Sequence, residues 1–167
     1  MRARLAPLLV LLLLILPLPP AHAAEPLRLM AGQTFPDQLQ AALDARPEDG
    51  PVEVINAGNS GETSSGGLAR LDWTLAEKPD ALILLLGAND ALRGLEPAET
   101  RKNLEAMLDS LERRGIPVLL AGMKAPPSLG SDYGAAFDEI YPALAARHDV
   151  VFYPFFLEGV AAQPALN

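Results

Sequence analysis

A chain of 167 residues with a formal net charge of −8 suits one acidic domain. An acidic surface repels the phosphate backbone of nucleic acids, so a nucleic-acid partner is not expected. The sequence contains no cysteine. This excludes disulfides, thiolate metal sites, a cysteine nucleophile and an anchor through a lipidated cysteine.

The first 23 residues are expected to be a signal peptide. Two early arginines supply a positive start, the run Leu5–Leu18 is almost wholly apolar, and Ala21-His22-Ala23 offers the small residues that a signal peptidase reads. The alternative is a membrane anchor, but the run is short for a span of ~20 residues and no charged stop-transfer cluster follows it. We therefore expect a domain over residues 24–167 in a periplasmic or secreted protein, with no stable membrane anchor after cleavage.

The rest of the chain alternates apolar runs with helical patterns. Strands are expected over Leu27–Met30, Val52–Ala57, Asp80–Leu86, Ile116–Ala121 and Val150–Tyr153. Helices are expected from Thr34, as the N-cap, to about Arg46, and over Leu68–Ala76, Pro97–Arg114 and Tyr133–Arg147. The run after Asp80 is apolar throughout, as a strand covered on both faces must be. This alternation predicts an α/β fold with a parallel sheet between helical layers.

In such sheets, ligands bind outside the carboxyl ends of the strands. The segments that leave those ends are Asn56–Thr63, Gly87–Asp90, Gly122–Pro127 and Pro154–Phe156. The first of them opens a Gly/Ser-rich loop, Gly58–Gly67, that has the strand–loop–helix placement of a phosphate site. It lacks a Gly-Lys-Ser/Thr motif and has no basic residue before Arg70, so phosphate binding is not favoured.

Together, Asn56-Ala-Gly-Asn-Ser-Gly-Glu-Thr63, Gly87-Ala-Asn-Asp90 and their flanks resemble the SGNH (GDSL) hydrolases, and most closely the periplasmic acyl-CoA thioesterase I, lysophospholipase and arylesterase branch. The resemblance implies a flavodoxin-like, three-layer α/β/α fold. It also implies hydrolysis of small acyl esters or thioesters by a serine and a histidine base, with an oxyanion hole and no cofactor.

The same resemblance assigns two oxyanion-hole donors, the main-chain amide of Gly61 and the side chain of Asn89. A glycine lets its N–H approach the developing negative oxygen closely, and a carboxamide is a neutral donor. The alternative is that Gly61 is an ordinary turn glycine and that Asn89-Asp90 forms an Asx-type turn. Their joint occurrence at the functional ends of adjacent strands favours the oxyanion hole. Asp90 is expected to orient the loop that carries Asn89.

Two blocks of the family pattern are missing. No Gly-Asp-Ser-Leu is present, because Leu27–Met30 runs straight into Ala31-Gly-Gln-Thr34. The chain also stops at Asn167, where the resemblance leads us to expect an Asp-x-x-His block. We therefore expect a fold truncated at its first crossover and at its C-terminus, and a chain that is inactive as written. The alternative function is a non-catalytic periplasmic binding or interaction protein whose remnant cleft holds an apolar ligand.

No other residue is expected to replace the missing ones. His148, the one histidine after residue 23, should lie at the amino edge of the sheet with only Asp149 nearby, so it is expected to be neither the base nor part of a metal site. Six hydroxyls are candidate nucleophiles, and none has an evident base to activate it. They belong to Thr34, Ser60, Ser64, Ser65, Ser128 and Ser131.

Overall fold

The structure is a computed structural model of the chain, and it describes residues 26–32, 35–46, 48 and 50–161. The expected signal peptide and the expected helix cap Thr34 lie outside the described residues. Within them, no helix is both long enough and apolar enough to cross a membrane.

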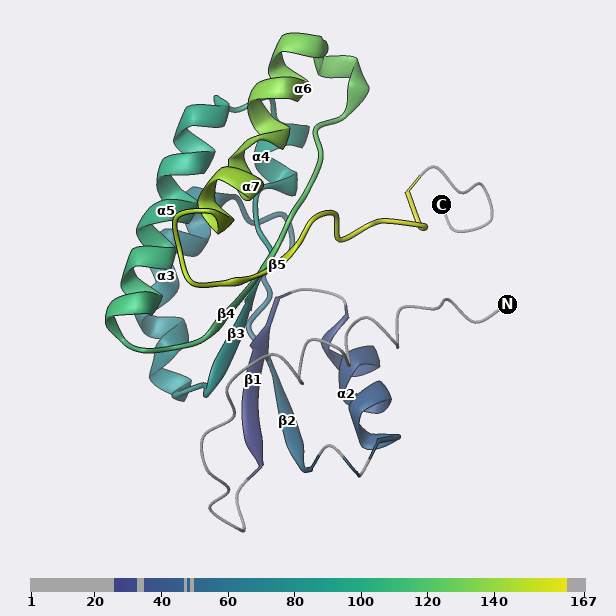
Figure 1. Cartoon of the computed structure of the whole chain (residues 1–167), viewed down its shortest axis with the longest axis vertical. Coiled ribbons are helices and arrows are strands. Elements are labelled where there is room, and N and C mark those ends of the chain that lie inside the picture. Colours follow the sequence, from purple (N-terminus) through teal and green to yellow (C-terminus); the bar gives the residue numbers. More distant parts are fainter. Residues whose placement is uncertain (1–25, 33–34, 47, 49, 162–167) are drawn as a thin grey trace.

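A parallel sheet of five strands forms the centre of the molecule (Figure 1). The strands are β1 (Leu27–Ala31), β2 (Val52–Asn56), β3 (Ala81–Leu84), β4 (Val118–Ala121) and β5 (Val151–Tyr153), in the order β2-β1-β3-β4-β5. In β1, Leu29 pairs with Val54 on one side and with Ala81 on the other. Because every pairing is parallel, the carboxyl ends of all five strands share one edge. The prediction of an α/β fold with a central parallel sheet is confirmed.

Helices flank both faces of this sheet. They are α2 (Pro36–Asp44), α3 (Ser64–Thr74), α4 (Ala88–Leu92), α5 (Pro97–Arg113), α6 (Ser131–Asp138) and α7 (Ile140–Ala145), with short 3-10 turns η2 (Leu75–Glu77) and η3 (Pro127–Leu129). In Figure 1, α3, α5 and α7 lie on one side of the strands and α2 lies on the other. The expected arrangement of a sheet between helical layers is therefore present.

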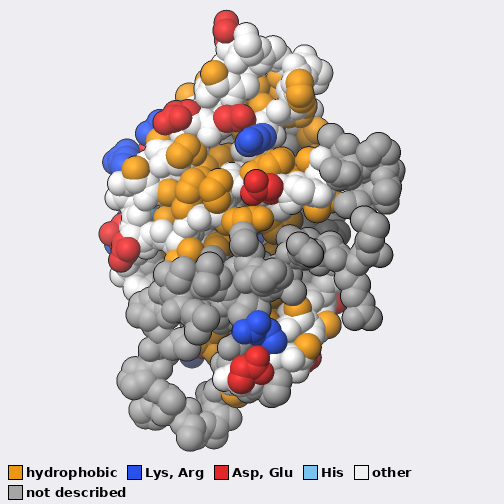
Figure 2. Space-filling model, turned by 45° about the vertical axis from the view of Figure 1, so that its right-hand side comes forward, with side chains coloured by type: hydrophobic (Ala, Val, Ile, Leu, Met, Phe, Trp, Pro, Cys, Tyr) orange, Lys and Arg blue, Asp and Glu red, His pale blue; other side chains and the backbone are white. Residues whose placement is uncertain are grey.

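Side chains alternate between the two faces of the sheet along each strand, and this divides the hydrophobic core into two clusters. Met30, Leu82 and Leu120 point to the side of α3 and α5, where they join one buried cluster. Ile83 and Leu119 point to the opposite side and join a second cluster with residues of α2. Since successive strand residues face opposite sides, a strand buried on both faces must be apolar at every position. On the face drawn in Figure 2, hydrophobic side chains gather over the middle of the molecule, with single charged side chains between them.

Helix α3 begins at Ser64, earlier than the expected start at Leu68. The side chain of Thr63 caps it by accepting a hydrogen bond from the Gly66 amide at 3.3 Å. The carboxylate of Asp90 accepts from the Ser64 amide at 2.8 Å. These contacts satisfy amide groups of the first turn that have no partner within the helix. Part of the Gly/Ser segment expected to be a loop is therefore helical.

Two further expectations about helices are wrong. The helix expected over Tyr133–Arg147 is broken between α6 and α7, because Pro142 has no N–H to donate to the carbonyl of Asp138. The first helix begins at Pro36 with Phe35 at the N-cap position, and Phe35 makes no side-chain capping bond. The short helix α4 was not expected, because Asn89-Asp90 was considered as an Asx-type turn.

Candidate functional site

The turn that follows β2 carries Gly61. Its first bend is closed by Asn56, whose side-chain oxygen accepts a hydrogen bond from the Gly58 amide at 2.9 Å. Gly61 has a φ of +75°, in the left-handed region that favours glycine. Its carbonyl oxygen accepts from Arg93 at 2.7 Å. No residue in the described part of the chain accepts a hydrogen bond from the Gly61 amide.

A partly buried ion pair holds the end of the turn. The guanidinium of Arg70 donates to both carboxylate oxygens of Glu62, at 2.5 and 2.6 Å, and to the carbonyl of Ala57 at 2.6 Å. The side chain of Glu62 is only 6% exposed. The hydrogen bond to Glu62 raises the pKa of the Arg70 guanidinium, although partial burial opposes this rise. A bidentate pair of this kind fixes both partners in one orientation, so the backbone on either side of Gly61 is held in place.

Asn89 lies in the first turn of α4, just after β3. The preceding Gly87 has a φ of +105°, and a Cβ atom on it would lie 2.2 Å from the hydroxyl oxygen of Tyr141. That hydroxyl donates to the carbonyl of Leu86 at 2.9 Å. Burial raises the pKa of the Tyr141 phenol well above its usual range, so it stays protonated as a donor. Tyr141 and Gly87 together therefore fix the exit of β3 that carries Asn89.

The carboxamide of Asn89 meets the turn that carries Gly61. Its Nδ2 atom donates to the carbonyl oxygen of Glu62 at 2.9 Å. The sequence placed the two segments on adjacent strands, but β1 lies between β2 and β3. The contact therefore joins the exits of the two strands that flank β1.

Asp90 is buried, with 2% of its surface exposed. Its carboxylate accepts from the amide and the hydroxyl of Ser64, at 2.8 and 2.5 Å, and from the hydroxyl of Thr100 at 3.3 Å. Asp90 thus ties α4 to the first turn of α3 and to α5, and so orients the segment that carries Asn89. Ser64 is fully buried and its hydroxyl also accepts from Asn103, so it is not available as a nucleophile.

A cleft of about 160 Å³ opens beside Asn89 at the carboxyl edge of the sheet. Its walls are mostly apolar. They are formed by Phe35, Glu62, Leu85, Leu86, Gly87, Ala88, Asn89, Met123, Phe156 and Leu157. The rings of Phe35 and Phe156 pack against each other, with centroids 5.2 Å apart. The cleft therefore offers an apolar surface beside one carboxamide donor.

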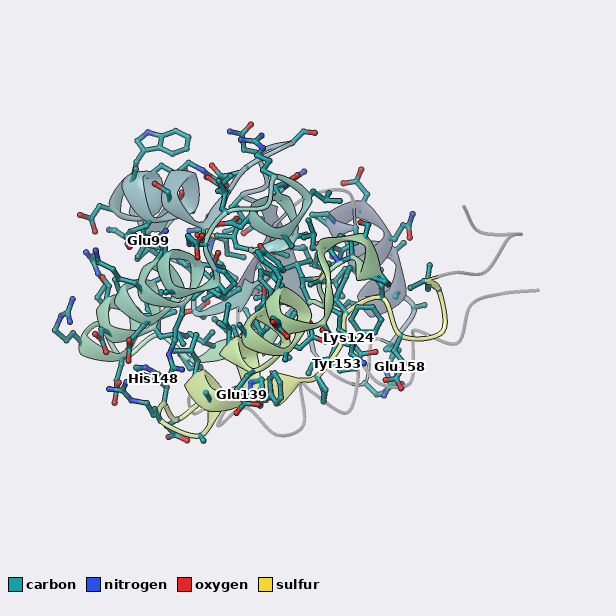
Figure 3. The ribbon with its side chains drawn as sticks, turned by 90° about the horizontal axis from the view of Figure 1, so that it is seen from above. Glu99, Lys124, Glu139, His148, Tyr153 and Glu158 are labelled. Carbon is teal, nitrogen blue, oxygen red and sulfur yellow. The ribbon has the colours of Figure 1, made fainter. Side chains whose placement is uncertain are left out.

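The structure places His148 far from this cleft. His148 lines a different depression, together with residues at the amino ends of β4 and β5, as the sequence predicted. In Figure 3 it lies well apart from Lys124, which follows β4 at the opposite edge. The expectation that only Asp149 would lie near His148 is wrong, because the Nδ1 atom of His148 is 3.3 Å from the carboxylate of Glu112. This pairing joins residues 36 positions apart, so no local pattern could have shown it.

Comparisons with known proteins agree with this architecture. The model of the GDSL-like lipase/acylhydrolase family matches residues 21–167. The chain is 48% identical over 108 residues to esterase TesA of Pseudomonas aeruginosa, a match that covers 64% of this chain and 54% of the relative. It is 40% identical over 114 residues to thioesterase 1/protease 1/lysophospholipase L1 of Escherichia coli K12, covering 68% of this chain and 55% of the relative.

The chain thus spans about half the length of these curated relatives. A solved structure of AlinE4, an SGNH-hydrolase family esterase, superposes with a TM-score of 0.80 at 42% identity, and the match covers 86% of this chain and 84% of that one. The family match extends over most of the sequence, and the strand order and flanking helices fit it. The chain belongs to the GDSL-like lipase/acylhydrolase family.

Proposed function

We propose that the cleft beside Asn89 is the acyl-binding and oxyanion-holding part of an ester hydrolase site, with the Gly61 amide and the Asn89 carboxamide as the two donors. The observation that carries this proposal is the hydrogen bond of 2.9 Å from Asn89 Nδ2 to the Glu62 carbonyl, which fixes the carboxamide against the turn that carries Gly61. The carboxamide nitrogen of Asn89 carries two hydrogens. One is used by Glu62, and the other remains for the oxygen of a bound ester.

The walls of the cleft support a small acyl ester or thioester as the ligand. Leu85, Leu86 and Met123 present an apolar surface to an acyl chain. The volume of about 160 Å³ is below the roughly 300–1,000 Å³ that is typical of sites for drug-sized ligands. We therefore favour short acyl chains. The esterase and thioesterase names of the relatives agree with this substrate class.

We further propose that this chain, as written, does not turn such esters over. Between Ala31 and Pro36 the sequence runs Gly-Gln-Thr-Phe, so no serine follows β1 where the family has its nucleophile. His148, the only histidine among the described residues, lies at the opposite edge of the sheet. A hydroxyl without a base is a poor nucleophile at neutral pH.

The cellular location of the protein is part of the same proposal. The charged start, the apolar run and the Ala21-His22-Ala23 segment support export through a cleaved signal peptide. We therefore place the protein, with a domain over residues 24–167, in the periplasm or outside the cell. A ligand that reaches the cleft would then come from the envelope or the medium.

The alternative is a protein that binds an apolar ligand in the same cleft and has no role for an oxyanion hole. Two measurements on the full chain separate these functions. The first is hydrolysis of a chromogenic butanoate ester, for which we expect no rate above background. The second is a calorimetric measurement of butanoate binding, in which the carboxylate of butanoate imitates the oxyanion. We expect saturable binding that Asn89→Ala weakens about tenfold or more, because a hydrogen bond to a charged group is lost.

The exposed hydroxyl of Ser128 provides the control, since Ser128→Ala should leave butanoate binding unchanged. Turnover that Asn89→Ala abolishes would contradict the predicted inactivity. Butanoate binding that is equally strong in Asn89→Ala would remove the oxyanion role and favour the apolar binding protein.

A further inference from the structure

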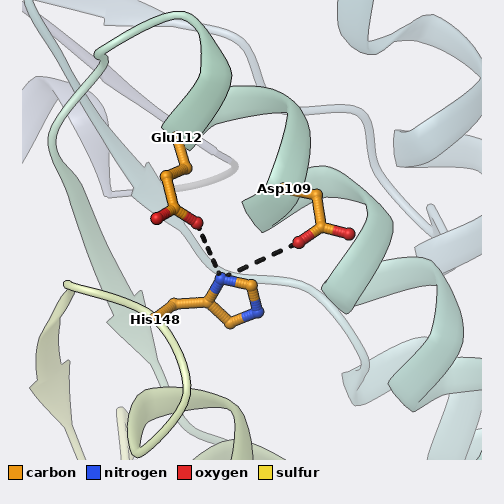
Figure 4. A group of neighbouring side chains, drawn as sticks. All are labelled: Asp109, Glu112 and His148. Carbon is orange, nitrogen blue, oxygen red and sulfur yellow. Dashed lines mark hydrogen bonds and ion pairs between the residues drawn. The ribbon is translucent and has the colours of Figure 1, made fainter.

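Three side chains that can bind a metal ion, those of Asp109, Glu112 and His148, converge on one another (Figure 4). Glu112 and His148 line the depression at the amino ends of β4 and β5, so the cluster is far from the cleft beside Asn89. The Nδ1 atom of His148 lies 3.3 Å from a carboxylate oxygen of Glu112 and 4.0 Å from one of Asp109. The three donor atoms all lie within 4.8 Å of one another. They come from two elements, because Asp109 and Glu112 belong to α5 and His148 follows α7.

The backbone positions these three residues next to one another. Asp109 and Glu112 are three positions apart on α5, so they project from the same side of the helix. The amide of His148 donates to the carbonyl of Leu144 at 3.1 Å, and its own carbonyl accepts from Val150 at 3.0 Å. The backbone of His148 is therefore fixed between the end of α7 and the start of β5.

The two carboxylates lack a positive partner from arginine or lysine. Among the described residues, the ion pairs of Asp109 and Glu112 are with His148 alone. The nearby Arg147 pairs with Glu105, and Arg114 pairs with Asp72. With a neutral imidazole the cluster carries two negative charges, which a divalent cation would balance.

The imidazole itself is incompletely partnered. Its side chain is only 6% exposed, and its Nε2 atom has no hydrogen-bond partner in the part of the chain that the structure describes. Nε2 points away from the two carboxylates (Figure 4), so it takes no part in the proposed site. Nδ1, by contrast, faces the two carboxylates, which is the arrangement that a metal ion between them would require.

We propose that His148 Nδ1, Glu112 and Asp109 bind a divalent transition-metal ion of the zinc class. Zinc binds imidazole nitrogen at about 2.0–2.1 Å and carboxylate oxygen at about 2.0–2.2 Å, so ligand atoms 3.3 and 4.0 Å apart can share one ion. The exposed carboxylates can shift to bring the third distance into range. Magnesium and calcium prefer sets of oxygen ligands, so the imidazole favours a transition metal.

The surroundings leave room for further ligands. A depression of about 470 Å³ adjoins the cluster and is lined by Glu112, His148 and Asp149. Three protein ligands with an open position for water are common in zinc sites. The ion would link α5 to the segment that enters β5. It would stabilise the fold without reaching the cleft beside Asn89, so this inference does not depend on the proposed function.

The test is a calorimetric titration of the full chain, stripped with EDTA, with zinc chloride. We expect one zinc ion per chain. Asp109→Asn and Glu112→Gln should each weaken binding about tenfold or more, because each removes one ligand charge. Glu99→Gln, on the first turn of the same helix, makes the same chemical change away from the cluster and should bind zinc like the parent.

A second readout is thermal unfolding. At zinc concentrations about 100-fold above the dissociation constant, linkage predicts an increase in melting temperature of about 5–10 °C for a domain of this size. Substitution of the buried His148 could unfold the chain, so the two exposed carboxylate variants are used, and circular dichroism verifies their fold. Absence of saturable zinc binding to the parent would overturn the proposal. Binding that keeps its affinity in the double variant D109N/E112Q would also overturn it.

Discussion

The side chain of Asn89 donates a hydrogen bond of 2.9 Å to the main-chain carbonyl of Glu62, 27 residues earlier. The two residues follow β3 and β2, which flank β1 in the sheet. The bond therefore joins two strand exits across the end of the strand between them. It brings the carboxamide to the turn of Gly61, on which the proposed function depends.

Replacing Asn89 by alanine should destabilise the protein modestly. The variant leaves the Glu62 carbonyl without this donor, and the loss of a typical hydrogen bond costs about 1 kcal/mol. Water can reach the partly buried site and recover some of this energy. We expect the free energy of unfolding in urea to fall by about 1 kcal/mol, with Ser128→Ala as an unchanged control. A fall above about 3 kcal/mol would show that Asn89 is chiefly structural.

Asp90→Asn should cost more, because Asp90 is buried and accepts three hydrogen bonds. The new amide group would place a donor against the donors of Ser64 or Thr100. Hydrogen bonds to a charged group contribute about 1.5–3 kcal/mol, so we expect a loss of about 2–3 kcal/mol in urea unfolding. Asp132→Asn, at an exposed position, should change stability by less than about 0.5 kcal/mol. Equal effects of the two variants would contradict the anchoring role of Asp90.

Glu62→Gln should weaken the turn after β2. The neutral amide cannot form the bidentate ion pair with Arg70, and Glu62 is nearly buried. Removing one partner of a fully buried pair costs about 3–5 kcal/mol. Since Arg70 is partly exposed, we expect about 2–3 kcal/mol by chemical denaturation. The exposed pair of Glu99 and Lys102, 3.9 Å apart, supplies the control, because Glu99→Gln should cost less than about 1 kcal/mol.

Two glycine-to-alanine changes should have opposite signs. At Gly87 the positive φ and the 2.2 Å approach to Tyr141 leave no space for a methyl group, so Gly87→Ala should lower stability by about 2 kcal/mol or more. Gly134 lies within α6, and a methyl group added there would meet no neighbouring described atom within 4 Å. Gly134→Ala should therefore raise stability by about 0.5–1 kcal/mol. Thermal melts of both variants measure the contrast, and a stabilising Gly87→Ala would refute the packing argument.

The strands and the long helix α5 were predicted close to their observed bounds. Their apolar spacing is set by the neighbours in the chain, and burial of that pattern is what forms the element. The start of α3 was missed although the local cap Thr63 precedes it, and part of its first turn depends on Asp90, which lies 26 residues away from Ser64. The break before α7 could have been predicted, since Pro142 stands inside the expected helix.

The candidate site was predicted only in part. Gly61 and Asn89 were proposed from a resemblance to a family, and the structure brings the Asn89 side chain to the turn after Gly61. The ion pair of Glu62 and Arg70 was not predicted. The two charges are eight positions apart on a loop and a helix, and their spacing by itself predicts no contact.

The amino-acid sequence by itself determined the class of this protein. The spacing of hydrophobic residues and the positions of turn residues act over short stretches of chain, and together they specify the strands and helices of an α/β fold. Only the tertiary structure decided which polar side chains meet. His148 reaches Glu112 across 36 residues, because the position of α5 beside the end of α7 is set by the packing of both helices on the sheet.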